Sequence, residues 1–212
     1  VGTGGIGDAH AHTVTNSTIA GNLYCATGSG NNKACNTSLS DPAPQGFPIS
    51  QANIDQWKEE ANEGTTISGN FTLNASSSPL GPVKITGDLT VTNNSTLTLT
   101  GTVWVVGNVM IDNNAIVRLS SGYGSNSGVL IADGRVLVQN NATFQGSGTS
   151  GSYLLLLTTS DCPISASCSG ARAITLSNNV GTVVLNAQIG TIYFSNNAGA
   201  KQATAHTIDL EN

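Results

Sequence analysis

The chain has 212 residues, of which 38% are hydrophobic and only 9% are charged, and its formal net charge is −5. An ordinary globular domain has about 25% charged residues, so hydroxyl and amide groups must cover much of this surface instead. A chain with this charge has no basic field that could neutralise a run of phosphates, which argues against nucleic acid as a partner.

Residues 1–48 are expected to form an N-terminal extension that ends in a proline-rich linker. Within it Asp8, His10 and His12 alternate, so a strand would point all three side chains the same way. Two histidines and one carboxylate could bind zinc or iron, but no fourth ligand accompanies them. We therefore expect a hydrogen-bonded or solvated strand here, and no metal or other cofactor.

Four cysteines form two close pairs, Cys25 with Cys35 and Cys162 with Cys168. Neither spacing resembles a zinc knuckle, so we expect two local disulfides, with free thiols or a metal site as the alternatives. Disulfides indicate an oxidising compartment, and therefore an extracellular or cell-surface location. No apolar run approaches the roughly 18 residues of a membrane helix, so no membrane span is expected.

A helix is predicted over residues 49–64. Ser50 is a favourable N-cap residue and Gly64 a favourable residue after the last turn. The apolar stripe of this helix consists of Ile54, Trp57 and Ala61. We expect it to cover an apolar face or an open end of the domain that follows, because solenoids need polar caps.

From residue 65 to residue 212 one phrase recurs: a small residue, an alternating apolar stretch and a pair of asparagines. In four copies a glycine stands six residues before the first asparagine, as in Gly87 and Asn93. Repeats of about 20 residues are typical of solenoids. The asparagines predicted to open each corner are Asn93, Asn113, Asn140, Asn178 and Asn196.

The copy between Gly87 and Gly107 shows how one rung closes. Three short alternating stretches are separated by turns at Asn93-Asn94 and near Gly101. The pattern predicts an all-β fold, a right-handed parallel β-helix (β-solenoid) with three short strands per rung and one N-terminal α-helix. Asparagine suits the corners because it tolerates left-handed backbone and its amide can bond to the next rung. We expect these residues to be structural.

One outward-facing column of the predicted coil is unusually apolar. It contains Thr90, Met110, Leu137, Thr175, Tyr193 and Asp209. Exposed apolar columns usually mark a covered face, so we expect the N-terminal helix to lie on it, with a neighbouring chain as the alternative.

Most of the chain from Pro48 onward resembles the β-solenoid ectodomains of bacterial surface proteins that follow a prepilin-type segment and are associated with type IV pilus assembly. The phrases that carry the resemblance are Gly81-Pro-Val-Lys-Ile-Thr-Gly87, Leu97-Thr-Leu-Thr-Gly-Thr-Val103, Tyr123-Gly-Ser-Asn-Ser-Gly128 and Ser195-Asn-Asn-Ala-Gly-Ala-Lys201. The resemblance implies a pilus-linked or cell-surface role and no catalytic residues. The hydrophobic prepilin helix is absent from this sequence. A weaker likeness to bactofilin-type solenoids implies a cytoplasmic filament, which the cysteine pairs argue against.

These observations predict a non-enzymatic extracellular structural protein: a pilus-associated component or filament-forming subunit, with other cell-surface components as partners. An adhesive role toward glycans is an extension of this hypothesis, with Trp104, Tyr123 and Tyr153 as the aromatic candidates. The alternative is a polysaccharide lyase or hydrolase built on the same coil. Such chemistry needs paired carboxylates, and Asp112 and Asp133 are the acids that it would require.

The segment from His206 onward begins another rung in register, with Ile208 and Leu210 at the positions that face the core. An uncovered rung presents unpaired backbone groups and apolar side chains. We therefore expect either end-to-end self-association through these two residues or a longer parent protein that supplies further rungs.

Overall fold

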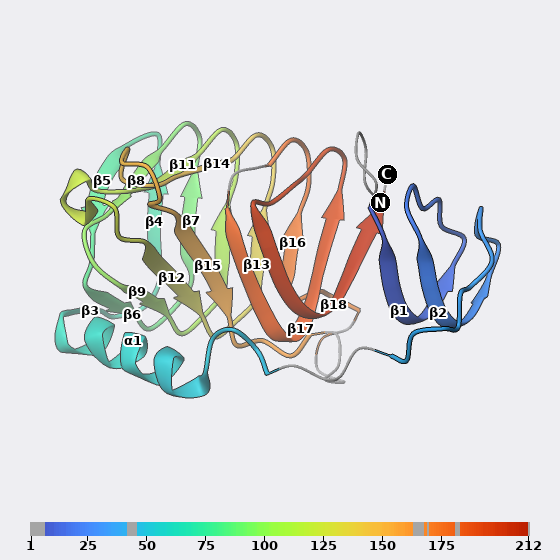
Figure 1. The fold of residues 1–212 in the computed structure, drawn as a ribbon. Helices are drawn as coiled ribbons and strands as arrows, with labels where there is room; N and C mark the ends of the chain where they lie inside the picture. The colour runs from blue at the N-terminus through green and yellow to red at the C-terminus, as the bar shows by residue number, and fades with distance from the viewer. Residues whose placement is uncertain (1–6, 42–45, 163–167, 169, 181–182, 212) are drawn as a thin grey trace. The chain divides into compact units, whose positions relative to one another are not determined.

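The computed structural model describes residues 7–41, 46–162, 168, 170–180 and 183–211 (Figure 1). The chain forms two compact units, residues 1–46 and residues 47–212, and each is described by itself. The larger unit is a right-handed parallel β-helix with three short strands in each regular rung, and the predicted fold class is confirmed.

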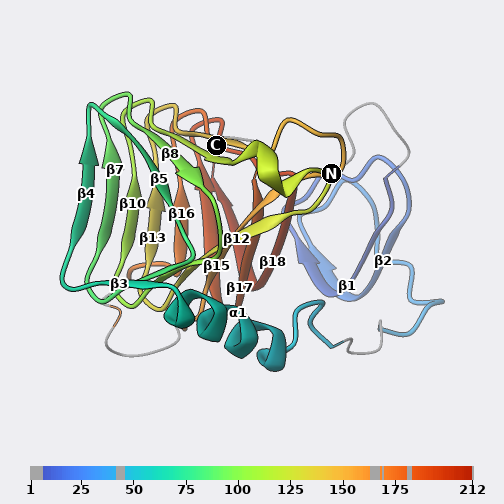
Figure 2. The ribbon, with the colours of Figure 1, turned by 90° about the vertical axis from the view of Figure 1, so that its left-hand side faces the viewer.

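The strands of the larger unit stack into three columns, and every pairing between neighbours is parallel (Figure 2). The first column consists of β4 (Phe71–Asn74), β7 (Leu89–Thr92), β10 (Val109–Ile111), β13 (Val136–Val138) and β16 (Ile174–Leu176). The second consists of β5 (Ser77–Leu80), β8 (Thr96–Leu99), β11 (Ile116–Leu119) and β14 (Thr143–Gln145). The third consists of β3 (Thr65–Ile67), β6 (Val83–Ile85), β9 (Val103–Val105), β12 (Gly128–Ala132) and β15 (Leu154–Thr158).

Two longer strands, β17 (Val184–Ser195) and β18 (Gln202–Glu211), pass through the third column, turn a corner and continue in the first. The corner is marked by a register shift in their ladder between Ala187 and Thr191. A short 3-10 helix, η1 (Ser121–Tyr123), lies in the loop before β12. These elements keep the residues of successive rungs in register along the coil.

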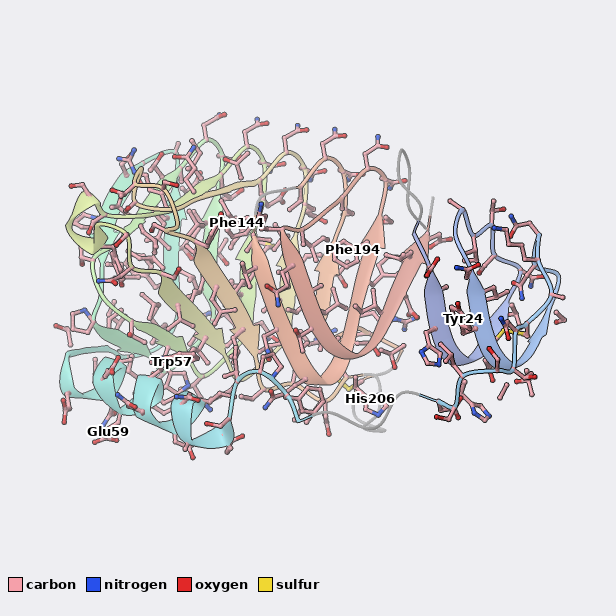
Figure 3. The ribbon with its side chains drawn as sticks, in the orientation of Figure 1. Tyr24, Trp57, Glu59, Phe144, Phe194 and His206 are labelled. Carbon is pink, nitrogen blue, oxygen red and sulfur yellow. A yellow bond between two sulfur atoms is a disulfide. The ribbon has the colours of Figure 1, made fainter. Side chains whose placement is uncertain are left out.

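Alternate residues along each strand point inward and together form the core. In β7, Leu89 and Val91 are fully buried, and they pair in register with the buried Val109 and Ile111 of β10. Phe144 is the largest of the fully buried side chains and lies within the coil (Figure 3). Complete burial of one such aliphatic or aromatic side chain contributes about 1.5–3 kcal/mol, and stacking repeats this gain on every rung.

The asparagine pairs form the corner between the first and second columns. All ten asparagines have left-handed backbone, with φ between 50° and 64°. The first amide of each pair bonds to the first amide of the preceding rung, over 2.9–3.4 Å. Asn74 of β4 occupies the start of this ladder, where it accepts a hydrogen bond from Asn93. The residues predicted to open the corners therefore do occupy them.

Helix α1 (Gln51–Glu63) begins at Ser50, whose side chain and that of Asn53 cap each other's backbone N–H groups. At the other end Gly64 does not adopt left-handed backbone, because its φ is −78°. Glycine is needed there for space instead: a Cβ atom would lie 2.2 Å from the carbonyl oxygen of Pro82.

The apolar stripe of α1 packs on the outward side of the third column (Figures 2 and 3). Ile54 is buried together with Ile131 and Leu157, and Trp57 packs against this cluster. The expectation that α1 covers the outward side of the first column is therefore wrong. The third column offers the outward apolar residues Val129, Ile131 and Leu157, and Lys58 pairs there with Asp133 at 2.5 Å.

The smaller unit repeats the construction on a reduced scale. Strands β1 (Ala9–Thr15) and β2 (Leu23–Ser29) pair in parallel, and the buried Ile19 packs beside them. The Asp8 carboxylate accepts the backbone N–H of Asn22 at 2.6 Å, as Asp88 of the larger unit accepts that of Asn108 at 2.7 Å. The N-terminal extension is thus a short parallel β structure in its own right.

Candidate functional site

An open groove runs across the outward side of the first column. The middle residues of successive strands lie side by side in register and face away from the core. They line a groove of about 680 Å³. These residues are Thr90, Met110, Leu137, Thr175 and Tyr193. Neighbouring strands lie about 4.8 Å apart, so this floor extends over roughly 19 Å.

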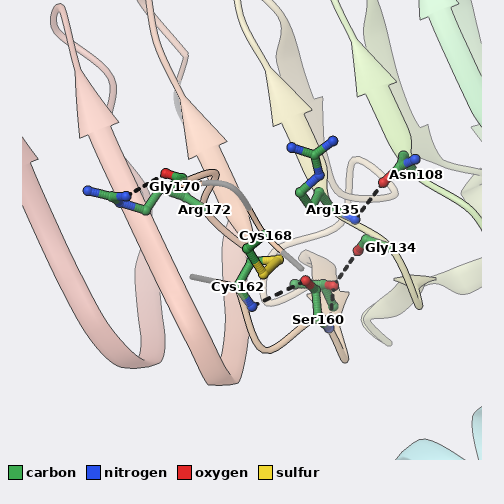
Figure 4. The surroundings of a disulfide bond; sticks show 9 residues. Asn108, Gly134, Arg135, Ser160, Cys162, Cys168, Gly170 and Arg172 are labelled. Carbon is green, nitrogen blue, oxygen red and sulfur yellow. Dashed lines mark hydrogen bonds between the residues drawn. A yellow bond between two sulfur atoms is a disulfide. The ribbon is translucent and has the colours of Figure 1, made fainter. Parts of the chain in front are cut away.

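A polar ladder forms the rim at the start of each strand. The side-chain oxygen of Asn70 accepts the backbone N–H of Asp88, Asp88 accepts that of Asn108, and Asn108 accepts that of Arg135, over 2.7–2.9 Å. Arginine has no acceptor, so the ladder stops at Arg135. Arg135 directly precedes β13, whereas Arg172 stands two residues before β16, at the position that Gly134 holds in the preceding rung. Both arginines line the groove (Figure 4).

A small network holds Arg172 and Tyr193 in place. Arg172 donates to the Asp209 carboxylate at 2.9 Å and lies 5.9 Å from the centre of the Tyr193 ring. The Tyr193 hydroxyl donates to the Glu211 carboxylate. This hydrogen bond raises the pKa of Tyr193 above its ordinary value, because ionisation would leave two negative charges in contact.

Arg135 is the unpaired cation of the groove. Its side chain is exposed, and within the described residues its guanidinium has no hydrogen bond or ion pair. The carboxylates of Asp88, Asp209 and Glu211 are each engaged by a neighbouring residue. The free charge available to a ligand is therefore positive, and it lies beside an apolar floor.

Asp88 and Glu211, at the two ends of the groove, lie too far apart to act as a hydrolytic pair. Asp88 precedes β7 and Glu211 lies on β18, so five strand spacings, roughly 24 Å, separate them. Glycoside hydrolysis by two acids requires a separation of about 5–9.5 Å. The groove suits an elongated ligand with apolar faces and hydroxyl groups, held by ring contact and hydrogen bonds.

The histidines of β1 find separate partners. His10 lies 2.8 Å from the carbonyl oxygen of Ser40, and His12 lies 2.6 Å from the Asp41 carboxylate. Asp8 caps the N–H of Asn22 instead of facing these rings. Asp8, His10 and His12, which the sequence offered as metal ligands, therefore each bond to a different partner.

Both predicted disulfides are present, Cys25–Cys35 and Cys162–Cys168. Disulfide bonds form and persist in oxidising compartments. Among the described residues, Asp161 and the two sulfurs of the second bridge form the one group of three ligand-type atoms within 4.8 Å. Sulfurs that are bonded to each other are not thiolate ligands, so this group offers a cation a single carboxylate.

The aromatic residues proposed for glycan contact lie away from the groove. Trp104 is half-buried beside α1, with the Lys84 ammonium 4.3 Å from its ring centre. Tyr123 is half-buried in the loop before β12, where burial raises the pKa of its hydroxyl. Tyr153 is 38% exposed but lines a different pocket. The aromatic ring of the groove is Tyr193.

Sequence reasoning identified the floor of the groove but not its rim. Arg135 stands directly before the first buried residue of its strand, the place that Asp88 and Asn108 hold in other rungs, whereas Arg172 takes the place of the recurrent glycine. Aligning the recurrent glycine and the residue that follows it would have placed both arginines along this rim.

Ile208 and Leu210 of β18 are 44% and 78% exposed. They pair in register with Ile192 and Phe194 of β17, so they occupy the core-facing positions that the sequence predicts.

No helix in the described part of the chain combines the length and the apolar character that crossing a membrane requires. Comparison of the sequence with protein-family models and with curated proteins finds no match, and comparison of the fold with solved structures finds none either.

Proposed function

We propose that this chain is a non-enzymatic structural component of a cell-surface assembly, and that its rigid coil presents a glycan-binding groove. The observation that carries the proposal is the groove of the first column, which is lined by an apolar floor, the ring of Tyr193 and the exposed guanidinium of Arg135. Sugar rings have apolar faces and hydroxyl edges, which such a surface complements. The resemblance to pilus-associated ectodomains and the two disulfides support the extracellular setting.

A glycan array followed by calorimetric titration of the bound glycan tests the groove. Tyr193→Ala and Arg135→Ala should each weaken binding by about ten-fold, which corresponds to about 1.4 kcal/mol. Tyr153→Ala is the matched control, because it removes a partly exposed tyrosine that lies outside the groove. Absence of glycan binding by the intact chain, or equal losses in all three variants, would contradict the groove assignment.

The enzymatic alternative, a polysaccharide lyase or hydrolase, requires free acids, and the two acids named for it are engaged in structure. Asp112 accepts hydrogen bonds from Asn140 at 2.7 Å and from Gln139 at 3.2 Å. Asp133 accepts from Trp104 and Thr159, each at 2.9 Å, in addition to its ion pair with α1. This engagement supports the non-enzymatic proposal. Turnover of a polyuronate that is lost in Asp112→Asn or Asp133→Asn would overturn it.

Self-association through β18 is a second proposal, favoured by the exposure of its apolar residues. Within the described residues β18 forms its ladder with β17, and Leu210 is the most exposed large hydrophobic residue. An apolar strand edge of this kind can template pairing with another chain, and such contacts generate filaments when they do not close. Negative-stain images and size-exclusion profiles should show assemblies that Leu210→Lys abolishes. Monodisperse monomers of the unaltered chain at all concentrations would refute the idea.

A further inference from the structure

A second pocket lies on the outward side of the third column, whereas the groove lies on the first. It is marked by a buried amide oxygen that has no hydrogen-bond partner among the described residues. Asn186 lies in β17 and is 1% exposed, and its Oδ1 atom has no hydrogen-bond partner among the described residues. The neighbouring residues Leu185 and Ala187 point into the core, so Asn186 points outward from the third column. Buried polar atoms are nearly always paired, and an unpaired one needs an explanation.

Asn186 lines a pocket of about 270 Å³ between the third column and the segment that enters α1. Pro48 and Ile49 form one wall, and Leu155 and Val184 lie on the strands opposite. The remaining lining residues are Ser127, Tyr153, Leu185, Gln202 and Thr204. The pocket is therefore largely apolar, with a single buried unpaired acceptor.

The size and the lining decide which ligand fits. Pockets for drug-sized ligands have volumes of about 300–1,000 Å³, so this smaller one suits a single ring system. No charged side chain lines it, which disfavours an ionic ligand. A sugar ring would bury several hydroxyls against apolar walls. An aromatic ring with one N–H or O–H group brings a single donor, which the unpaired oxygen of Asn186 can accept.

Tyr153 gives the pocket an aromatic side. Its ring is partly exposed, and the Lys201 ammonium lies 5.8 Å from its centre, so one face is already contacted by a cation. Aromatic pairs in stacked or edge-to-face geometry add to the gain from burial.

We propose that this pocket binds one aromatic ring that carries a single hydrogen-bond donor, of the indole or phenol type, with the donor directed at Oδ1 of Asn186. This site is separate from the groove and does not depend on the function proposed for it.

Calorimetric titration of the whole chain with indole and with 1-methylindole tests the proposal directly. The two rings differ in that the second has no N–H donor. Indole should bind saturably, and 1-methylindole should bind about ten-fold more weakly, because it leaves the buried oxygen unpaired. Equal affinities, or no saturable binding of either ring, would overturn the proposal, and neither measurement requires a variant to fold.

Two variants then locate the site. Asn186→Leu removes the acceptor at nearly constant size and should abolish the preference for indole. Gln188→Leu is the matched control, because it removes the other buried unpaired oxygen of β17 but lies outside the pocket. The preference should survive in this control, and a preference that persists in Asn186→Leu would refute the assignment of the donor's partner.

Discussion

Replacing Asn140 tests how the corners stabilise the coil. Its backbone is left-handed, with φ of 52°. Its amide donates to Asp112 at 2.7 Å and to Asn113 at 3.4 Å, and accepts from Asn178 at 2.9 Å. Alanine removes these hydrogen bonds and keeps a Cβ atom in left-handed backbone without the polar group that lets asparagine tolerate it. Glycine removes the same bonds but adopts left-handed backbone without cost.

The two contributions have separable magnitudes. The two shorter hydrogen bonds together are worth about 2 kcal/mol. Left-handed backbone costs a residue such as alanine about 1–2 kcal/mol. We therefore expect Asn140→Ala to lose about 3–4 kcal/mol of unfolding free energy. Asn140→Gly avoids the backbone cost but increases the freedom of the unfolded chain, which costs about 0.5–1 kcal/mol, so it should lose about 2–3 kcal/mol.

Urea unfolding followed by circular dichroism measures both losses on one scale. Asn197 provides the control, because it also has left-handed backbone, with φ of 62°, but its side chain makes no hydrogen bond within the described residues. Asn197→Gly should lose only about 0.5–1 kcal/mol, which the added freedom of the unfolded chain costs. The reasoning fails if Asn140→Gly is as stable as the unaltered chain, since the amide ladder would then contribute nothing, or if alanine and glycine at 140 are equivalent.

Three further predictions follow from the packing and the charges. Ile54→Ala should cost about 2–4 kcal/mol in the same urea assay, because Ile54 is buried under α1; a loss below 1 kcal/mol would contradict the observed docking. Glu211→Gln should lower the raised pKa of Tyr193 in a phenolate absorbance titration. That hydrogen bond stabilises the fold below the ordinary tyrosine pKa of about 10 and is lost as pH rises through the raised value, so a stability difference that grows with alkaline pH would be inconsistent. Replacing Cys162 and Cys168 together with serine should cost about 2 kcal/mol, as expected for a short closed loop, and a neutral result would contradict this estimate.

The sequence determines the first column and its corner almost completely. A glycine six residues before an asparagine pair leaves room for one short alternating strand. The left-handed backbone of the two asparagines then turns the chain into the next strand. This is why residues such as Leu89 and Val109 could be assigned to the core without coordinates.

The position of α1 could not be obtained in the same way. Its stripe shows which side of the helix is apolar but not which column it covers, and both the first and third columns present outward apolar residues. A usable signal lies in the continuous runs Val129–Ala132 and Leu154–Leu157, because a strand without alternation is buried on both faces. These two strands do lie in the third column, and Ile131 and Leu157 contact the helix cluster.

The rim of the groove and the pocket at Asn186 are less accessible to sequence reasoning. Arg135 and Arg172 line the same groove only because β13 and β16, which are far apart in the sequence, pair in register. Asn186 stands in a strand whose other residues are mostly apolar, and nothing local shows that its amide oxygen lacks a partner.

The corner ladder also gives the coil a direction. From Asn93 to Asn196 every amide of the first row donates its N–H group to the preceding rung, and in the second row Asn141 and Asn179 do the same. The amide dipoles are therefore aligned head to tail and polarise one another. One end of the row offers donors, at Asn74, and the other offers acceptors, at Asn196. Two such coils can continue each other's ladders only when they point the same way, so any stack joined through this corner would be a polar one.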